Sequence, residues 1–220
     1  MLKEGVALLG VGAAATGGFL AYNGVSNSKT KTYSIKDLLA TKNPKKRLIA
    51  KSTDGSSPEW KAVWKLYATE YKNNNHNLFS LASINSEKTI DDNQPAPSEF
   101  MSKCESLVME HVVNEKDDKY QGVLKYCTRD ALIKDLILES GRVVLQESDD
   151  WGDSWKSYRA ANTDKEDQQD TWKLKDWNTK KSNDSTISDD LKKKCKEKLE
   201  AKVGDQVDGD YSNIVKWCSK

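Results

Sequence analysis

Four cysteines are the side chains whose types and spacing point most directly to chemistry. Cys104 and Cys127 lie 23 residues apart, and so do Cys195 and Cys218. A disulfide within each pair would close a short loop and stabilise the fold by about 3 kcal/mol on loop-entropy grounds. For an exported protein we predict these two disulfides, whereas buried free thiols are the alternative in a reducing compartment.

The cysteines lack the neighbouring residues that zinc binding or cysteine catalysis would need. No two cysteines have C-x₂-C spacing, and the histidines, His76 and His111, are matched in the second half of the chain by Asp167 and Lys202. A zinc site needs four ligands in close pairs, and a thiol nucleophile needs a base such as histidine. The sequence therefore predicts no metal site and no cofactor.

Other catalytic motifs are also missing from the sequence. It contains no G-x-S-x-G, H-E-x-x-H, Walker or dinucleotide-binding pattern. Carboxylates are plentiful, but the pairs at residues 149–150 and 189–190 resemble helix starts, so no acid–base pair can be singled out. We predict no catalytic residues and no enzyme, with a secreted or anchored hydrolase as an alternative.

The cysteine pairs belong to an internal repeat with an offset of 91 residues. The same offset superposes aromatic residues: Trp60 on Trp151, Trp64 on Trp155, Tyr67 on Tyr158 and Tyr120 on Tyr211. Such self-similarity indicates duplicated supersecondary units. We predict two homologous units, called unit 1 (residues 34–129) and unit 2 (residues 130–220).

The repeated aromatic residues predict the core of each unit. In unit 1 the spacing i, i+4, i+7 and i+11 places four rings on one face of a helix that Ser57 and Pro58 are suited to start. A carbohydrate or peptide platform is the alternative use of such rings, but helical spacing favours a core. The predicted aromatic core comprises Trp60, Trp64, Tyr67, Tyr120, Trp151, Trp155, Tyr158, Tyr211 and Trp217.

Two further helices in each unit should carry the cysteines on their apolar faces. Ser98 and Ser188 are suited to start the first of these helices. When two such helices face each other, their cysteines come into disulfide range. The predicted fold class is therefore mainly α, with two tandem homologous small helical modules and room for one short strand in each, at residues 47–49 and 142–145.

Unit 1 should be longer than unit 2 near its start. A short segment beginning at Ile35 recurs at Ile133 with an offset of 98, so unit 1 has about seven extra residues. We place them in a surface loop at Lys42–Lys46. The middle of each unit, residues 72–97 and 163–187, diverges between the copies and is predicted to be variable surface, where binding specificity tends to lie.

The N-terminal residues predict attachment to a membrane. Residues 1–26 form a hydrophobic signal or anchor segment, and residues 27–33 form a polar tether. Residues 5–22 carry no charge and reach the lower limit of a membrane span. We favour an uncleaved anchor, with cleavage as the alternative. The lysines that follow favour a cytoplasmic body, whereas the cysteines favour an extracellular one.

The overall charge disfavours a nucleic-acid partner. The chain has 35 basic and 34 acidic residues and a formal net charge of +1. Nucleic-acid binding normally leaves a basic footprint. We therefore expect no nucleic-acid partner.

The whole layout resembles the paralogous families of uncharacterised, N-terminally anchored proteins of haemotropic mycoplasmas. The resemblance rests on the Gly/Ala-rich segment GVALLGVGAAATGGFLAY, the tether NSKTKTYSIKDLL, the paired tryptophans, the Lys-Cys helices, and the closing motifs YQGVLKYC and YSNIVKWC. Unit 1 departs from the closing motif at Tyr126, where the family has tryptophan. The resemblance implies display on the cell surface and antigenic variation.

These observations together lead to an expected role. We expect a membrane-anchored, surface-exposed protein with an extracellular body, attached through residues 5–22. It would act in antigenicity or host interaction, with a host surface protein or glycan as partner. A cytoplasmic-facing membrane scaffold with reduced thiols is a further alternative, which the lysine flank favours.

Overall fold

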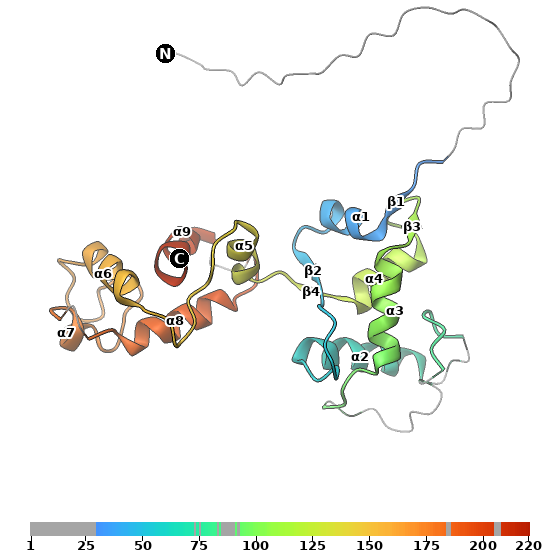
Figure 1. Cartoon of the computed structure of the whole chain (residues 1–220), viewed down its shortest axis with the longest axis horizontal. Helices are drawn as coiled ribbons and strands as arrows, with labels where there is room; N and C mark the ends of the chain where they lie inside the picture. The colour runs from blue at the N-terminus through green and yellow to red at the C-terminus, as the bar shows by residue number, and fades with distance from the viewer. Residues whose placement is uncertain are drawn as a thin grey trace, which may run out of the picture. The chain divides into compact units, whose positions relative to one another are not determined.

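The computed structural model describes residues 30–220, except residues 73, 75, 83, 85–90, 92, 184–185 and 205–207. This part of the chain is mainly α-helical with a few short strands (Figure 1), so the predicted mainly α class is confirmed. The predicted membrane segment, residues 5–22, lies outside the described residues. Within them, no helix is both long enough and apolar enough to cross a bilayer.

A serine caps each of the two helices of unit 1 that begin at Ile35 and Pro58. Its elements are β1 (Tyr33–Ser34), α1 (Ile35–Lys42), β2 (Lys46–Leu48), α2 (Pro58–Tyr71), α3 (Ser98–Val108), β3 (His111–Val112), α4 (Asp118–Tyr126) and β4 (Thr128–Asp130). The Ser57 hydroxyl accepts a hydrogen bond from Trp60 N at 3.3 Å, and Pro58 occupies the first turn of α2. This confirms the predicted helix start, because a serine cap satisfies an N–H group that has no partner within the helix.

Unit 2 is also mainly helical. Its elements are α5 (Ile133–Glu139), α6 (Gly152–Ala161), α7 (Trp177–Lys180), α8 (Asp189–Leu199), the 3₁₀ helix η2 (Asp208–Asp210) and α9 (Tyr211–Cys218). Ser188 caps α8 by accepting a hydrogen bond from Leu191 N at 2.9 Å, as predicted. Asp150 accepts a hydrogen bond from Gly152 N at 2.8 Å at the start of α6.

The same antiparallel pairings occur in both units. In unit 1, β1 pairs with β3 and β2 pairs with β4. Isolated bridges take their places in unit 2. The corresponding residue pairs are Ser34 with His111 and Leu48 with Thr128 in unit 1, and Leu132 with Lys202 and Val144 with Ser219 in unit 2.

These pairings correct the predicted position of the extra residues in unit 1. The offset between units is 98 at Ile35 and Ile133, 96 at the paired residues Leu48 and Val144, and 91 at Trp60. Two extra residues therefore precede β2, and five lie between β2 and α2. The prediction that all of them lie at Lys42–Lys46 is wrong, because main-chain pairing sets the register of β2 and the side-chain pattern alone does not.

Each unit has its own cluster of buried residues. In unit 1 the cluster runs from Ile35 to Cys127, and in unit 2 from Ile133 to Cys218. Helices α2 and α3 pack on α4, and α6 and α8 pack on α9. Burying a large apolar side chain contributes about 1.5–3 kcal/mol, so aromatic side chains let short helices form a stable core.

Candidate binding surfaces

The four cysteines form two disulfides, which join the helices that the sequence paired. Cys104 on α3 bonds to Cys127 at the end of α4, and Cys195 on α8 bonds to Cys218 at the end of α9. Their Cα atoms are 5.5 Å and 5.4 Å apart, within the usual range for disulfides. The structure contains no free cysteine, so these sulfur atoms serve as covalent links between helices.

The predicted aromatic residues lie inside the two units. Tyr211 is half-buried against the unit 2 cluster. The other eight are at most 2% exposed: Trp60, Trp64, Tyr67, Tyr120, Trp151, Trp155, Tyr158 and Trp217. Rings buried to this degree offer no open face to a sugar. The carbohydrate-platform alternative therefore gains no support from these eight residues.

A buried turn held by Tyr67 anchors the divergent segment of unit 1. The Tyr67 hydroxyl donates to Asn77 Oδ1 at 2.7 Å and accepts from Phe79 N at 2.8 Å. Asn77 Oδ1 also accepts from Leu81 N at 2.7 Å, while its Nδ2 donates to Leu81 O at 3.0 Å. Burial raises the pKa of Tyr67 to about 12, so the hydroxyl stays protonated and able to donate.

The same turn occurs in unit 2 with an aspartate in place of the asparagine. The Tyr158 hydroxyl donates to Asp170 Oδ2 at 2.5 Å and accepts from Trp172 N at 2.9 Å. Leu174 N donates to the same carboxylate oxygen at 2.9 Å. Asp170 is 1% exposed, and its Oδ1 has no hydrogen-bond partner among the described residues. Burial, with the hydrogen bond to Asp170, raises the pKa of Tyr158.

Sequence comparison alone did not find this shared turn. Phe79 corresponds to Trp172 and Leu81 to Leu174, both at an offset of 93, which differs from the 91 of the flanking helices. The sequence does contain a shared pattern that could have revealed the turn. In both segments two apolar residues follow an Asn or Asp at the second and fourth positions after it. The prediction of a variable surface in residues 72–97 and 163–187 can therefore apply only outside the turns, because side chains of the turns belong to the buried clusters.

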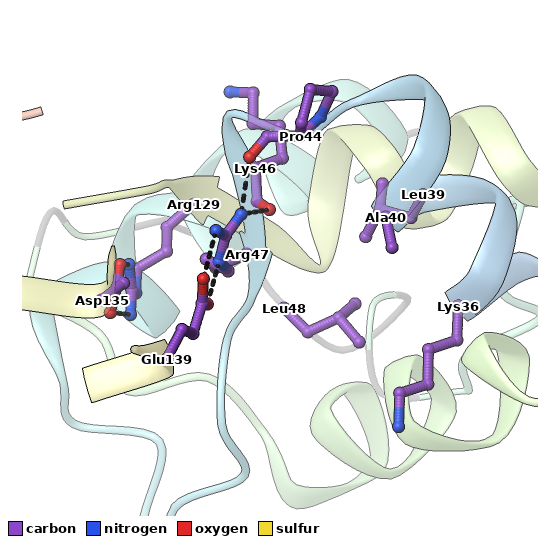
Figure 2. A pocket seen from close by; sticks show the side chains of 10 residues that line it. All are labelled: Lys36, Leu39, Ala40, Pro44, Lys46, Arg47, Leu48, Arg129, Asp135 and Glu139. Atoms are coloured by element: carbon purple, nitrogen blue, oxygen red, sulfur yellow. Dashed lines mark hydrogen bonds and ion pairs between the residues drawn. The ribbon is translucent and has the colours of Figure 1, made fainter. Parts of the chain in front are cut away.

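A first surface pocket, of about 570 Å³, lies beside α1, β2 and α5 (Figure 2). The Arg47 guanidinium binds Glu139 through two bonds, of 2.6 Å and 2.8 Å, and also donates to Pro44 O. Arg129 binds Asp135 in the same two-bond manner, at 2.6 Å and 2.8 Å. Both guanidinium groups are thus paired with carboxylates.

These ion pairs explain why the pKa values of Arg47 and Asp135 are shifted. The hydrogen bond with Glu139 raises the pKa of Arg47. Burial acts to raise the pKa of Asp135, but hydrogen bonds from Arg129 and from Leu132 N outweigh it and leave that pKa lowered. A charged ligand would have to compete with these ion pairs, and paired charges are costly to separate. We therefore interpret this pocket as a contact between α5 and the β2 region and not as a ligand site.

A second pocket, of about 710 Å³, lies between residues 144–147 and α8 in unit 2 and is named the α8 groove here. It combines buried apolar residues with several lysines of α8. Its volume falls within the range of small-ligand and peptide sites. The groove thus combines an apolar lining with positive charge, which suits a binding site.

Comparisons with known proteins do not indicate a function for this chain. No family model, no curated protein and no solved structure matches this chain. Among the described residues, no group of three or more His, Cys, Asp and Glu side chains is placed to hold a metal ion.

Proposed function

We propose that this chain is a membrane-anchored protein whose body is displayed on the outside of the cell, where it interacts with a host partner. The body would consist of two homologous, disulfide-bonded helical modules, units 1 and 2, behind an N-terminal anchor at residues 1–26 and a tether at residues 27–33. The proposed partner is a host surface protein or glycan, and the contact regions are the exposed parts of residues 72–97 and 163–187.

One observation carries this proposal: each unit has a disulfide that joins the same two helices at the same positions. Disulfides form and persist in oxidising environments outside the cytosol. A unit of about 90 residues has a thin core, and a disulfide is a common means of stabilising such a unit. This supports an external body over a cytoplasmic scaffold with reduced thiols.

The repeated interactions support the proposal of duplicated modules. The disulfide, the two antiparallel pairings and the tyrosine-centred turn of unit 1 each have a counterpart in unit 2. Duplication of one module explains why so many unrelated kinds of contact recur in the same order.

Labelling of cysteines on intact cells tests the location. Cells are treated with a membrane-impermeant maleimide, with and without a prior impermeant reductant, and the mass of the protein is measured. We expect four labels only after reduction, since the four cysteines are paired. Labels that appear only after lysis would place the body in the cytoplasm and would contradict the proposal.

A further inference from the structure

We propose that the α8 groove of unit 2 binds an extended acidic peptide segment of a partner protein. This inference deepens the proposed host-interaction role by naming the chemistry of the partner and the site that receives it. The binding chemistry itself is a property of the purified chain and does not depend on where the protein is displayed.

The shape of the groove suits an extended chain. One wall is a single face of α8, because its lining residues follow helical spacing at Asp189, Lys192, Lys193, Lys196 and Leu199. The opposite wall is segment 144–147, in which Val144 forms an antiparallel bridge with Ser219 and Glu147 begins a turn. Val144, Leu145, Trp151 and Leu199 form an apolar floor, and each is at most 9% exposed.

The charges that remain unpaired in the groove are mostly positive. Three of its charged residues already have partners, since Lys134 pairs with Glu200 at 2.7 Å within the groove and Asp189 pairs with Lys180 at 3.2 Å. Within the described part of the chain, Lys193 and Lys196 have no ion-pair partner.

Lys192 adds a third such ammonium group to the wall. Its Nζ lies 5.9 Å from the centre of the Trp151 ring, which attracts the cation without neutralising its charge. Glu147 is the one groove carboxylate without an ion pair among the residues that the structure describes. Three unpaired lysines against one carboxylate favour an anionic ligand.

At the positions of two groove lysines, unit 1 carries residues that contact the connection between β2 and α2. Its counterpart of Lys192 is Met101, which is 2% exposed and accepts a weak hydrogen bond from Ser52 at 3.7 Å. Its counterpart of Lys196 is Glu105, which pairs with Lys51 at 2.8 Å. Ser52 and Lys51 belong to the longer connection between β2 and α2. Unit 2 lacks the five extra residues of this connection and carries lysines instead, so its groove is open and charged.

The main chain along the groove favours a peptide over a glycan. Val143 N and Leu145 N donate to Lys220 O and Cys218 O, each at 2.9 Å. In an antiparallel ladder the intervening residue, Val144, directs its main-chain groups to the other edge. Its C=O accepts a hydrogen bond from Gln146 Nε2 at 3.3 Å, and the main-chain groups of Gln146 are bonded to Asp149 and Trp151. The Val144 N–H, which has no partner among the described residues, is left for the carbonyl of an extended peptide. Trp151 is 2% exposed with Lys192 over its ring, so no open aromatic face awaits a sugar.

Fluorescence anisotropy with the purified, oxidised full-length chain in detergent tests the proposal. The probe is a fluorescein-labelled octapeptide of alternating Glu and Val, and the matched probe has Gln in place of each Glu. We expect the Gln peptide to bind about tenfold more weakly or worse, as expected when charge-assisted contacts are lost. No binding of the Glu peptide, or equal binding of both peptides, would overturn the proposal.

Variants of α8 identify the site. Lys192→Met installs the unit 1 residue, and Lys193→Gln with Lys196→Gln removes the other two unpaired charges; each should raise the Kd of the Glu peptide about tenfold. Lys194→Met is the control, because Lys194 lies on the same helix outside the groove and pairs with Glu197 at 3.4 Å. Thermal unfolding verifies that all variants fold. Unchanged Kd values in both groove variants would contradict the assignment.

A sulfated oligosaccharide serves as the competing ligand class. If a heparin-derived hexasaccharide binds with dependence on Lys192 and the Glu peptide does not bind, the groove is a glycan site and the peptide proposal fails. The location experiment on intact cells is separate. A cytoplasmic body with a peptide-binding groove would overturn the display proposal alone, and a displayed body without peptide binding would overturn this inference alone.

Discussion

At the residue scale, the most informative contrast is between Asn77 and Asp170, which hold equivalent turns. Asn77 uses both ends of its amide, since Oδ1 accepts two hydrogen bonds and Nδ2 donates one to Leu81 O. Asp170 has no donor when ionised, and its Oδ1 is unpartnered within the described residues. A buried polar atom without a partner lowers stability, so unit 2 retains a less stable form of the turn.

Replacing Asp170→Asn should therefore stabilise the protein by about 1 kcal/mol, because it removes a buried carboxyl and supplies a donor for the turn. Urea unfolding followed by tryptophan fluorescence measures the change. The matched variant, Asn77→Asp, should destabilise by at least as much. A stability loss in Asp170→Asn would show that the carboxyl has a partner that this structure lacks.

Asp130 links stability to pH. Hydrogen bonds from Lys202 and Lys46, both at 2.7 Å, lower its pKa from 3.8 to about 2. A carboxyl whose pKa is lowered on folding contributes stability that is present above the unfolded pKa and lost as pH falls through the folded pKa. The contribution should thus be full above about pH 5 and vanish near pH 2.

The Asp130→Asn variant tests this linkage. Its melting temperature should lie below that of the unsubstituted chain at pH 6, and the two curves should converge as pH falls to about 2. A constant difference across this range would mean that packing of Asp130, and not its charge, sets the effect.

At the element scale, the units depend on cross-links and caps because their helices are short. Isolated helices of this length are marginal in water, so most of their stability comes from packing. The disulfides join α3 to α4 and α8 to α9, and α4 and α9 also pack on α2 and α6, which carry buried tryptophan and tyrosine side chains.

Removal of the unit 2 disulfide by Cys195→Ala with Cys218→Ala should cost about 3 kcal/mol of unfolding free energy. Urea unfolding measures the loss. Reductant should lower the stability of the unsubstituted chain but should leave a variant without either disulfide unchanged. If reductant has no effect on the unsubstituted chain, the disulfides do not stabilise the fold in solution.

Loss of the Ser57 cap should destabilise α2. Ser57→Ala removes the acceptor for Trp60 N and should cost about 1 kcal/mol. Ser56→Ala is the neighbouring control, because the Ser56 hydroxyl donates to Asp54, outside the helix, and to no other described residue. Equal effects of the two changes would show that the cap is not the cause.

At the scale of the whole molecule, the presence of two buried clusters predicts two cooperative units. Trp155→Ala removes a fully buried ring from unit 2 and should cost about 3–5 kcal/mol there. Hydrogen exchange read by mass spectrometry should show faster exchange in α6, α8 and α9 and unchanged exchange in α2, α3 and α4. Faster exchange in both units would mean that they unfold together.

The sequence by itself determined the helical class, the disulfide pairing and most of the aromatic core. These features follow from the spacing of residues in the sequence. Helical periodicity indicates which side chains share a face, and the repeated offset indicates which residues correspond in the two units. It also fixed the starts of α2 and α8, since the serines that begin these helices cap them through contacts three residues away.

Only the tertiary structure decided the register of β2, the turns centred on Tyr67 and Tyr158, and the α8 groove. Each depends on contacts between residues far apart in sequence, such as Leu48 with Thr128. The groove is the clearest case. Its lysines lie on a face of α8, and they line a groove because the connection before α6 is too short to cover them.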